Sequence, residues 1–256
     1  MAKEGSGYSK LAGGGLMSSD MNTSFVLDMQ RKLYRWRNED PDKVFADLFN
    51  LVCDSKTLDE AWRRLAHNSG SQTPGTDGMT RRMVEQHPKG VAGFLDEIRE
   101  ALRNGTYSPE PVRQRLIPKP GKPEKFRPLG IPTLIDRLVQ MALKLVLEPI
   151  FEADFHPTSY GFRKGRSTHD ALERIVRFLH PTKRGPSVYS HVIEGDIKGC
   201  FDAIDHHVLM DRVRKRISDR KVLKLILSFL KAGGTIRHPV TGSPQGGIIS
   251  PMLSNI

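Results

Sequence analysis

Apolar residues recur at helical spacing over most of the first hundred positions. Over 43–54 they fall on one stripe, which predicts a helix. A second helix is expected directly afterwards, with an apolar face from Thr57 to Leu65. A turn-forming stretch at 72–78 precedes a third amphipathic segment at 91–104. This part of the chain is therefore expected to be helical and free of repeats.

The pattern changes between Pro109 and Pro132. Residues 112–118 alternate basic and apolar side chains, 119–125 are rich in turn formers, and 126–131 resume an extended pattern, which together predict a β-hairpin. The predicted hairpin carries a single acid, Glu124, among its cations, which are Arg113, Arg115, Lys119, Lys122, Lys125 and Arg127. A solvated surface explains such a run as readily as a polyanion site does.

Helical periodicity returns after the hairpin. Thr133 is placed to cap a long helix through Phe151, and Ser167 or Thr168 to cap another that reaches Leu179. An alternating pattern at 189–197 predicts a strand that ends in Asp196. Two helices are expected after it, at 206–217 and 219–231, then a turn at 241–247 and the start of a helix from Ser250.

Charge narrows the possible partners. The chain of 256 residues has 40 Lys and Arg against 29 Asp and Glu, a net charge of +11, and such an excess attracts polyanions such as RNA and DNA. A merely basic surface is the alternative. The two cysteines, Cys53 and Cys200, make no disulfide framework, and no apolar run is long enough to span a membrane, so a cytoplasmic protein is expected. The Gly- and Ser-rich residues 1–22 are expected to form a disordered leader.

Asp196 is the first candidate for chemistry. A carboxylate at a strand end is a suitable ligand for Mg²⁺, which prefers oxygen donors. On its own, Asp196 is equally a turn former at the end of a strand. Asp205 is expected to cap the helix that begins at His206 rather than to bind metal.

Several blocks together carry a family resemblance. The run 192–206, Val-Ile-Glu-Gly-Asp-Ile-Lys-Gly-Cys-Phe-Asp-Ala-Ile-Asp-His, closely resembles the motif with the first catalytic aspartate of group II intron reverse transcriptases. Other blocks resemble that family in the same order: Pro-Gly-Thr-Asp-Gly at 74–78, Ile-Pro-Lys-Pro at 117–120 with the Arg-Pro-Leu-Gly-Ile-Pro block at 127–137, Ser-Tyr-Gly-Phe-Arg at 159–163, and Gly-Ser-Pro-Gln-Gly-Gly at 242–251.

The resemblance implies an α+β fold of the right-hand polymerase kind, with helix-rich fingers, a β-hairpin, part of an antiparallel palm sheet and no thumb. It implies a helical amino-terminal extension at 23–108, fingers at 109–188 and a partial palm at 189–256. The implied function is RNA-directed DNA polymerisation, with intron splicing (maturase) and retrohoming roles in the intact protein. A non-catalytic intron-RNA-binding remnant or splicing helper is the alternative, and a reverse transcriptase adapted to defence or CRISPR systems shares the same motifs.

Residue roles follow from the same resemblance. Asp196 is the implied catalytic carboxylate and, with the Ile197 carbonyl, the implied ligand of Mg²⁺. Residues implied to bind dNTP are Lys119 and Arg127 at the triphosphate, Phe201 under the sugar and Gln245 near the base. Residues implied to contact RNA are Gly75, Gly78, Arg163, Lys164 and Arg166, with Tyr160 and Phe162 expected in the core.

The second catalytic block of the family, Tyr-Ala-Asp-Asp, does not occur before Ile256. The sequence looks cut at this point, and we expect this chain alone not to polymerise DNA. The expected partners are an intron RNA template, a DNA primer and dNTP. Self-association through the incomplete palm is expected as well, because an unpaired strand edge exposes backbone groups.

Overall fold

The computed structural model describes residues 15–180, 189, 191–232 and 240–256. Its elements, in chain order, are α1 (Gly15–Glu39), α2 (Phe49–Val52), α3 (Ser55–Ala66), the 3-10 turn η1 (Ser69–Gln72), α4 (Arg81–Glu85), α5 (Gly90–Asn104), β1 (Arg113–Lys119), β2 (Lys122–Ile131), α6 (Leu134–Glu152), α7 (Thr168–Leu179), α8 (His206–Arg214), α9 (Arg220–Ala232) and α10 (Ser250–Leu253). None of the described helices has an apolar stretch long enough to cross a membrane.

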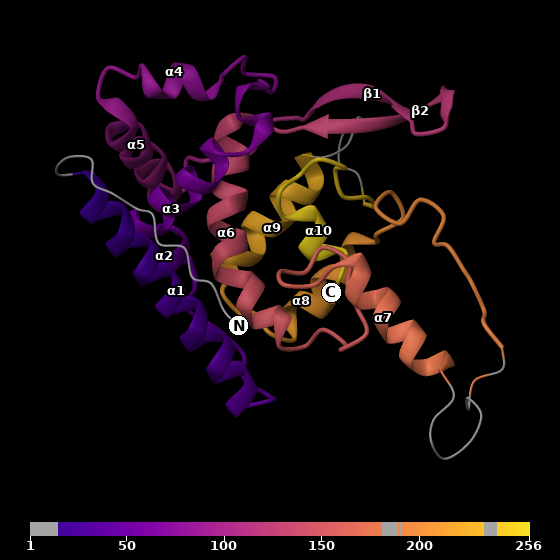
Figure 1. The fold of residues 1–256 in the computed structure, drawn as a ribbon. Coiled ribbons are helices and arrows are strands. Elements are labelled where there is room, and N and C mark those ends of the chain that lie inside the picture. Colours follow the sequence, from indigo (N-terminus) through magenta and orange to yellow (C-terminus); the bar gives the residue numbers. More distant parts are fainter. Residues whose placement is uncertain (1–14, 181–188, 190, 233–239) are drawn as a thin grey trace, which may run out of the picture.

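Helix α6 is the centre of the core. It lies between α1 and α3 on one side and α8, α9 and α10 on the other (Figure 1). Leu138, Val146 and Ile150 are fully buried in it, and the Thr133 hydroxyl accepts a hydrogen bond from the Asp136 N–H, which confirms Thr133 as its cap. Most of its surface is buried, apart from a half-buried stripe that includes Lys144 and Glu148, and α1, α2 and α3 pack against it.

The prediction of a disordered leader over 1–22 is wrong for residues 15–22, because α1 begins at Gly15. The remaining leader residues, 1–14, lie outside the described chain. Two side chains near the start of the helix are tied to α3, with Asn22 donating to Asp59 and Thr23 to Glu60, both at 3.0 Å. Farther along, Gln30 donates to the Leu145 carbonyl of α6 at 2.8 Å. These contacts with distant residues hold a helix that Gly/Ser composition alone did not indicate.

The helix predicted over 43–54 is wrong in its first half, because only α2, at residues 49–52, is helical. Phe45 instead forms a parallel bridge with Ile217. The Asp219 carboxylate accepts hydrogen bonds from the N–H groups of Leu48 and Phe49, at 2.9 and 2.8 Å. The backbone of this segment is thus satisfied by a distant part of the chain, which outweighs its helical periodicity.

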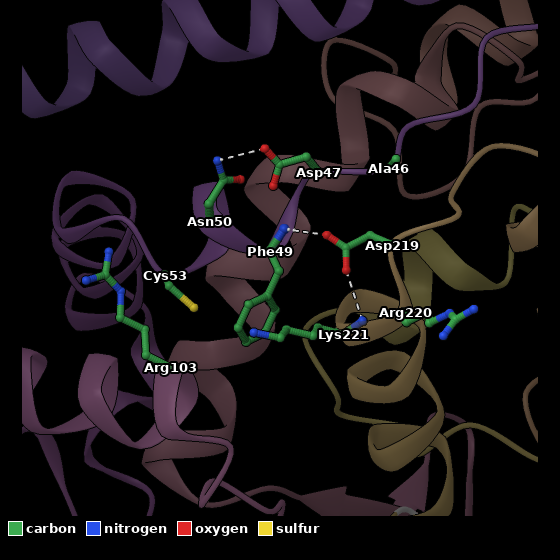
Figure 2. A pocket seen from close by; sticks show the side chains of 9 residues that line it. All are labelled: Ala46, Asp47, Phe49, Asn50, Cys53, Arg103, Asp219, Arg220 and Lys221. Atoms are coloured by element: carbon green, nitrogen blue, oxygen red, sulfur yellow. Dashed lines mark hydrogen bonds between the residues drawn. The ribbon is translucent and has the colours of Figure 1, made fainter.

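Asp219 also caps α9, since its other oxygen accepts from the N–H groups of Lys221 and Val222. Figure 2 shows this carboxylate beside a cavity of about 420 Å³ between α2, α5 and α9. Cys53 lies in the same cavity, and burial raises the pKa of its thiol to about 11. The thiol therefore stays protonated and inert at neutral pH.

The β-hairpin is confirmed. Strands β1 and β2 pair antiparallel from Arg113 opposite Ile131 to Pro118 opposite Phe126, and after a register shift Lys119 pairs with Lys122. Gly121, with φ +72°, makes the turn, so the connection is shorter than the sequence pattern predicted. Figure 1 shows the hairpin extending away from the helices.

The expected palm strand is wrong for this structure. Residues 191–197 have no regular secondary structure, and Val192 and Ile193 are 75% and 97% exposed. The described residues form a single sheet of two strands, β1 and β2, so no neighbouring strand accepts the backbone hydrogen bonds of this segment. The sequence pattern is that of a strand, but a strand needs a partner.

The remaining helices lie close to their predicted ranges. Ser167 caps α7 in a full capping box with Asp170, and Asp205 caps α8 by accepting from the Val208 N–H at 3.0 Å. Helix α8 ends at Arg214, before the expected 217. The short α4 and η1 were not predicted.

Candidate nucleotide and RNA site

Lys119 and Arg127, the two cations predicted to bind the triphosphate, lie exposed on the hairpin. Arg127 is opposite Ile117 in the register, so it shares a face with Arg115 and Arg113. No carboxylate of the described chain is in ion-pair distance of these arginines. This face therefore keeps its positive charge available to an anion.

The segment 242–249 joins Phe201 to the base of the hairpin. The Phe201 carbonyl accepts a hydrogen bond from the Ser243 N–H at 2.8 Å, and the Gln245 carbonyl accepts one from the Gly130 N–H at 2.7 Å. The structure thus brings Phe201, Gln245 and the strand that carries Arg127 together through backbone contacts. These three residues come from blocks far apart in the sequence.

Gly246 makes this close approach possible. A Cβ at this position would lie 2.3 Å from the Gly130 carbonyl oxygen, and its φ of +121° is outside the range of L side chains. The absence of a side chain at Gly246 therefore lets the backbone of this segment approach the backbone of Gly130.

Gln140 is a positioning residue that sequence reasoning missed. It is buried on α6, and its side-chain carbonyl accepts from the N–H groups of Ile248 at 2.8 Å and Ile249 at 3.4 Å. The available signal was a polar residue inside the apolar pattern of a predicted helix. Such residues satisfy buried backbone groups elsewhere.

Asp196 and Ile197 lie in the exposed segment 191–197. No group of three or more His, Cys, Asp and Glu that could hold a metal occurs within the described residues. The predicted catalytic carboxylate precedes Phe201 closely in the chain and belongs to no such group within the described residues.

Aromatic residues of the 159–163 block adjoin this region. Phe162, expected in the core, is 64% exposed and has φ 57°, and its ring meets that of half-buried Phe201 edge-on at 6.1 Å. The Arg166 guanidinium lies over the half-buried Tyr160 ring at 5.4 Å. The expectation of core packing is therefore wrong for Phe162.

Arg163 does not face solvent. It is 7% exposed and pairs with Glu152 at 2.6 Å, while its other terminal nitrogen donates to the carbonyls of His156 and Ser159. The predicted phosphate contact is wrong for this residue, because its donors are already used to hold the 156–163 loop on α6. Its neighbour Lys164 is exposed and remains a candidate, as does half-buried Arg166.

The glycines of the 74–78 block differ. Gly75 is buried, and a Cβ there would lie 2.5 Å from Thr133 Cα, so it packs against the start of α6 and the predicted RNA contact is wrong. Gly78 is exposed, with φ +71° and open space around it. The nearby cavity of about 480 Å³ is lined by three carboxylates, which disfavour phosphate; they belong to Asp77, Glu110 and Asp136.

Asp136 and Arg137 hold this block in place. Asp136 accepts from the Tyr107 hydroxyl at 2.6 Å, and burial raises the pKa of its carboxyl while burial and the nearby carboxylate raise the pKa of Tyr107. Arg137 donates to the carbonyls of Gly70 and Thr73 at 2.8 and 2.7 Å. Both residues are structural members of the 127–137 motif.

Comparison with protein families gives one match. The profile of the family described as reverse transcriptase (RNA-dependent DNA polymerase) matches residues 117–256. The matched region includes the hairpin from Ile117, α6 and the 242–249 segment.

Individual relatives extend the similarity toward the amino terminus. The chain is 42% identical over 235 residues to the protein YkfC of Escherichia coli, covering 90% of this chain and 60% of that protein. It is 38% identical over 227 residues to the group II intron-encoded protein LtrA of Lactococcus lactis, covering 85% of this chain and 35% of LtrA. It is 30% identical over 250 residues to the putative COX1/OXI3 intron 1 protein of Saccharomyces cerevisiae, covering 94% and 27%. The chain thus spans only part of the length of these relatives.

Proposed function

Because the chain belongs to the reverse transcriptase (RNA-dependent DNA polymerase) family and is of the group II intron-encoded type, we propose that it forms the template- and nucleotide-binding part of an RNA-directed DNA polymerase. In the complete protein, this polymerase also acts in intron splicing as a maturase and in retrohoming. Its partners are an intron RNA template, a DNA primer and dNTP.

One observation carries this proposal: segment 242–249 connects Phe201 to the hairpin base through the Ser243–Phe201 and Gly130–Gln245 hydrogen bonds. A dNTP at this junction would have its triphosphate toward the Arg127 face, where a guanidinium fork suits phosphate oxygens. Phe201 would lie against its sugar and Gln245 near its base. Lys119 lies beside the turn, at the end of the hairpin away from this junction, and its side chain is exposed. It would have to extend toward the junction to contact the triphosphate.

The domain organisation is proposed on the same basis. The helical extension reaches residue 108, the fingers span 109–188 and include the hairpin and α7, and the partial palm spans 189–256. Helix α1 belongs to the extension, since its Asn22 and Thr23 side chains bond to α3 of the same part of the chain. The exposed apolar side of α7 and the exposed segment 191–197 support self-association through this side of the molecule.

The donor set for a divalent cation is incomplete. The Asp196 carboxylate and the Ile197 carbonyl are oxygen donors of the kind that Mg²⁺ takes. Around them the described chain supplies no further cluster of acidic or imidazole ligands. Two donors do not complete an octahedral site, so we assign no catalytic step to a metal here.

RNA contact is proposed for exposed Gly78 and Lys164 and for half-buried Arg166. Lys164, Arg166 and the hairpin cations would release counterions from the RNA, which would supply most of the affinity. Template phosphates would position the strand, while the junction at Phe201 and Gln245 would select the nucleotide.

The experiment is fluorescence anisotropy with a labelled RNA template annealed to a DNA primer, at increasing salt. Wild type is expected to bind, with log K falling linearly against log salt. Adding Mg²⁺ and the next complementary dNTP is expected to slow dissociation, and Arg127→Ala to remove this dNTP effect. Lys32→Ala, on the exposed side of α1, is the matched charge control and is expected to keep it.

Each outcome decides between readings. Failure of wild type to bind the hybrid would overturn the proposal. Binding without any dNTP effect would favour the non-catalytic RNA-binding alternative. Primer extension that requires Mg²⁺ and is lost in Asp196→Ala would establish catalysis by this chain.

A further inference from the structure

The hairpin has two chemically different faces. Cross-strand partners share a face, so Arg115 with Leu129 and Ile117 with Arg127 lie on one side. Leu116 opposite Pro128 and Pro118 opposite Phe126 lie on the other. We name these last four residues the apolar hairpin face.

The apolar hairpin face is open to solvent. Leu116 is 64% and Phe126 is 52% exposed, and both prolines are exposed as well. Directly opposed side chains in an antiparallel pair lie within contact distance, so the four residues form one continuous patch. Apolar side chains of a hairpin usually pack on a core, and a contiguous exposed patch marks a binding surface.

Cations lie at the turn end of this patch. Lys119 and Lys122 pair across the turn beyond Pro118 and Phe126, and Lys125 precedes Phe126. Glu124 is the single acid of the hairpin, and within the described chain no carboxylate forms an ion pair with these lysines. A surface that joins flat apolar rings to unpaired ammonium groups is complementary to a strand with bases and phosphates.

We propose that the apolar hairpin face stacks unpaired bases of single-stranded RNA, with Phe126 as the main contact and Lys119, Lys122 and Lys125 on the phosphates. Aromatic rings stack on any base, whereas a duplex keeps its base faces hidden in its own stack. The ligand is therefore a single strand, read without sequence preference. The inference rests on the proposed function, because it concerns the template before it is copied.

The test compares two labelled twelve-residue strands, oligo(A) RNA and a fully abasic strand with the same phosphates. Phe126→Ala is expected to weaken oligo(A) binding about tenfold, the order of one lost stacking contact. It is expected to leave abasic binding and the salt slope unchanged. Lys122→Ala is expected to weaken both strands alike and to reduce the salt slope by about 0.7.

Two further variants keep the test independent of folding. Val44→Ala removes an exposed apolar side chain far from the hairpin, 47% exposed, and should change nothing. Phe126→Trp retains the ring and adds fluorescence, which oligo(A) should quench and the abasic strand should not.

The outcomes separate this inference from the proposed function. If wild type binds the template–primer hybrid but neither single strand, the inference alone fails; if it binds none of the three, the proposed function fails as well. If wild type binds oligo(A) and Phe126→Ala loses affinity for both strands equally or for neither, the stacking inference alone is overturned. Loss of self-association in Phe126→Ala, with RNA affinity intact, would show a protein interface and would also overturn it.

Discussion

The side-chain carbonyl of Gln140 accepts a hydrogen bond from the backbone N–H of Ile248 at 2.8 Å. Through this contact the central helix α6 fixes the segment that links Phe201 to the hairpin. Gln140→Leu would leave the half-buried N–H of Ile248 and the buried N–H of Ile249 without this acceptor, and a buried N–H without a partner costs about 1–3 kcal/mol. Urea denaturation should show this loss, and Gln114→Leu on the exposed hairpin should be neutral. Equal stability of the two variants would contradict the anchoring role.

Gly246→Ala tests the close approach of this segment to Gly130. The added Cβ meets the Gly130 carbonyl at 2.3 Å in a backbone conformation that alanine avoids. We expect a loss of about 1–3 kcal/mol in the free energy of unfolding. Gly161→Ala, where an added Cβ meets nothing within 4 Å, should stay within about 1 kcal/mol of wild type. A Gly246→Ala protein with wild-type stability would refute the packing argument.

Arg163 and Lys164 are adjacent cations with opposite expected behaviour. Arg163→Ala leaves Glu152 without its buried partner and should cost about 3 kcal/mol, with the salt slope of RNA binding unchanged. Lys164→Ala should leave the melting temperature unchanged. Its affinity for RNA should be lower than that of wild type at every salt concentration. Urea denaturation and anisotropy measured on both variants check the pair. If Arg163→Ala lowered the affinity for RNA and made the slope of log K against log salt shallower, Arg163 would contact phosphate after all.

Glu60 predicts a specific acid dependence of stability. Burial by itself favours the neutral carboxyl, but hydrogen bonds from Arg63, Arg64 and Thr23 outweigh it and lower the pKa from 4.5 to about 2. The folded pKa is depressed, so this stabilisation is present above pH 4.5 and is lost as pH falls toward 2. Wild type should exceed Glu60→Gln by roughly 3 kcal/mol at pH 6.

Urea denaturation from pH 6 to pH 2 measures this difference. The gap between wild type and Glu60→Gln should narrow below pH 4.5. Glu39→Gln removes an exposed carboxylate of the pair with Arg35 and serves as the matched control. A gap that stays constant down to pH 2 would show that the ion pairs around Glu60 are not the cause.

Helix α7 predicts self-association. Leu172, Ile175 and Val176 are 59%, 51% and 48% exposed on a helix with no buried residue. Ile175→Glu should shift sedimentation toward the monomer, because it puts a charge into this apolar surface. Glu173→Gln, on the same helix, should not. A monomer at all concentrations in wild type would dismiss the idea.

Helices with their own amphipathic stripe were predictable, because each satisfies its backbone locally. Residues 43–48 were not, since the Phe45 N–H bonds to the Arg216 carbonyl and the Leu48 N–H to Asp219. Residues 191–197 lack the neighbouring strand that a strand pattern presumes. For the site, motif order indicated Phe201, Gln245 and the hairpin, and the structure joins them. The order of the motifs could not show that Arg163 turns inward, because its partner Glu152 lies outside all of the motifs.

The carboxylate of Asp219 has a consequence for synthesis on the ribosome. It bonds to backbone groups 171 and 170 residues earlier, and Phe45 pairs with Ile217 in the same place. The backbone groups of Phe45, Leu48 and Phe49 therefore lack these partners until residues 216–219 have emerged from the exit tunnel. Contacts of such sequence separation form late and slow folding. The nascent amino-terminal extension is thus the part most dependent on chaperones until its last partner has been translated.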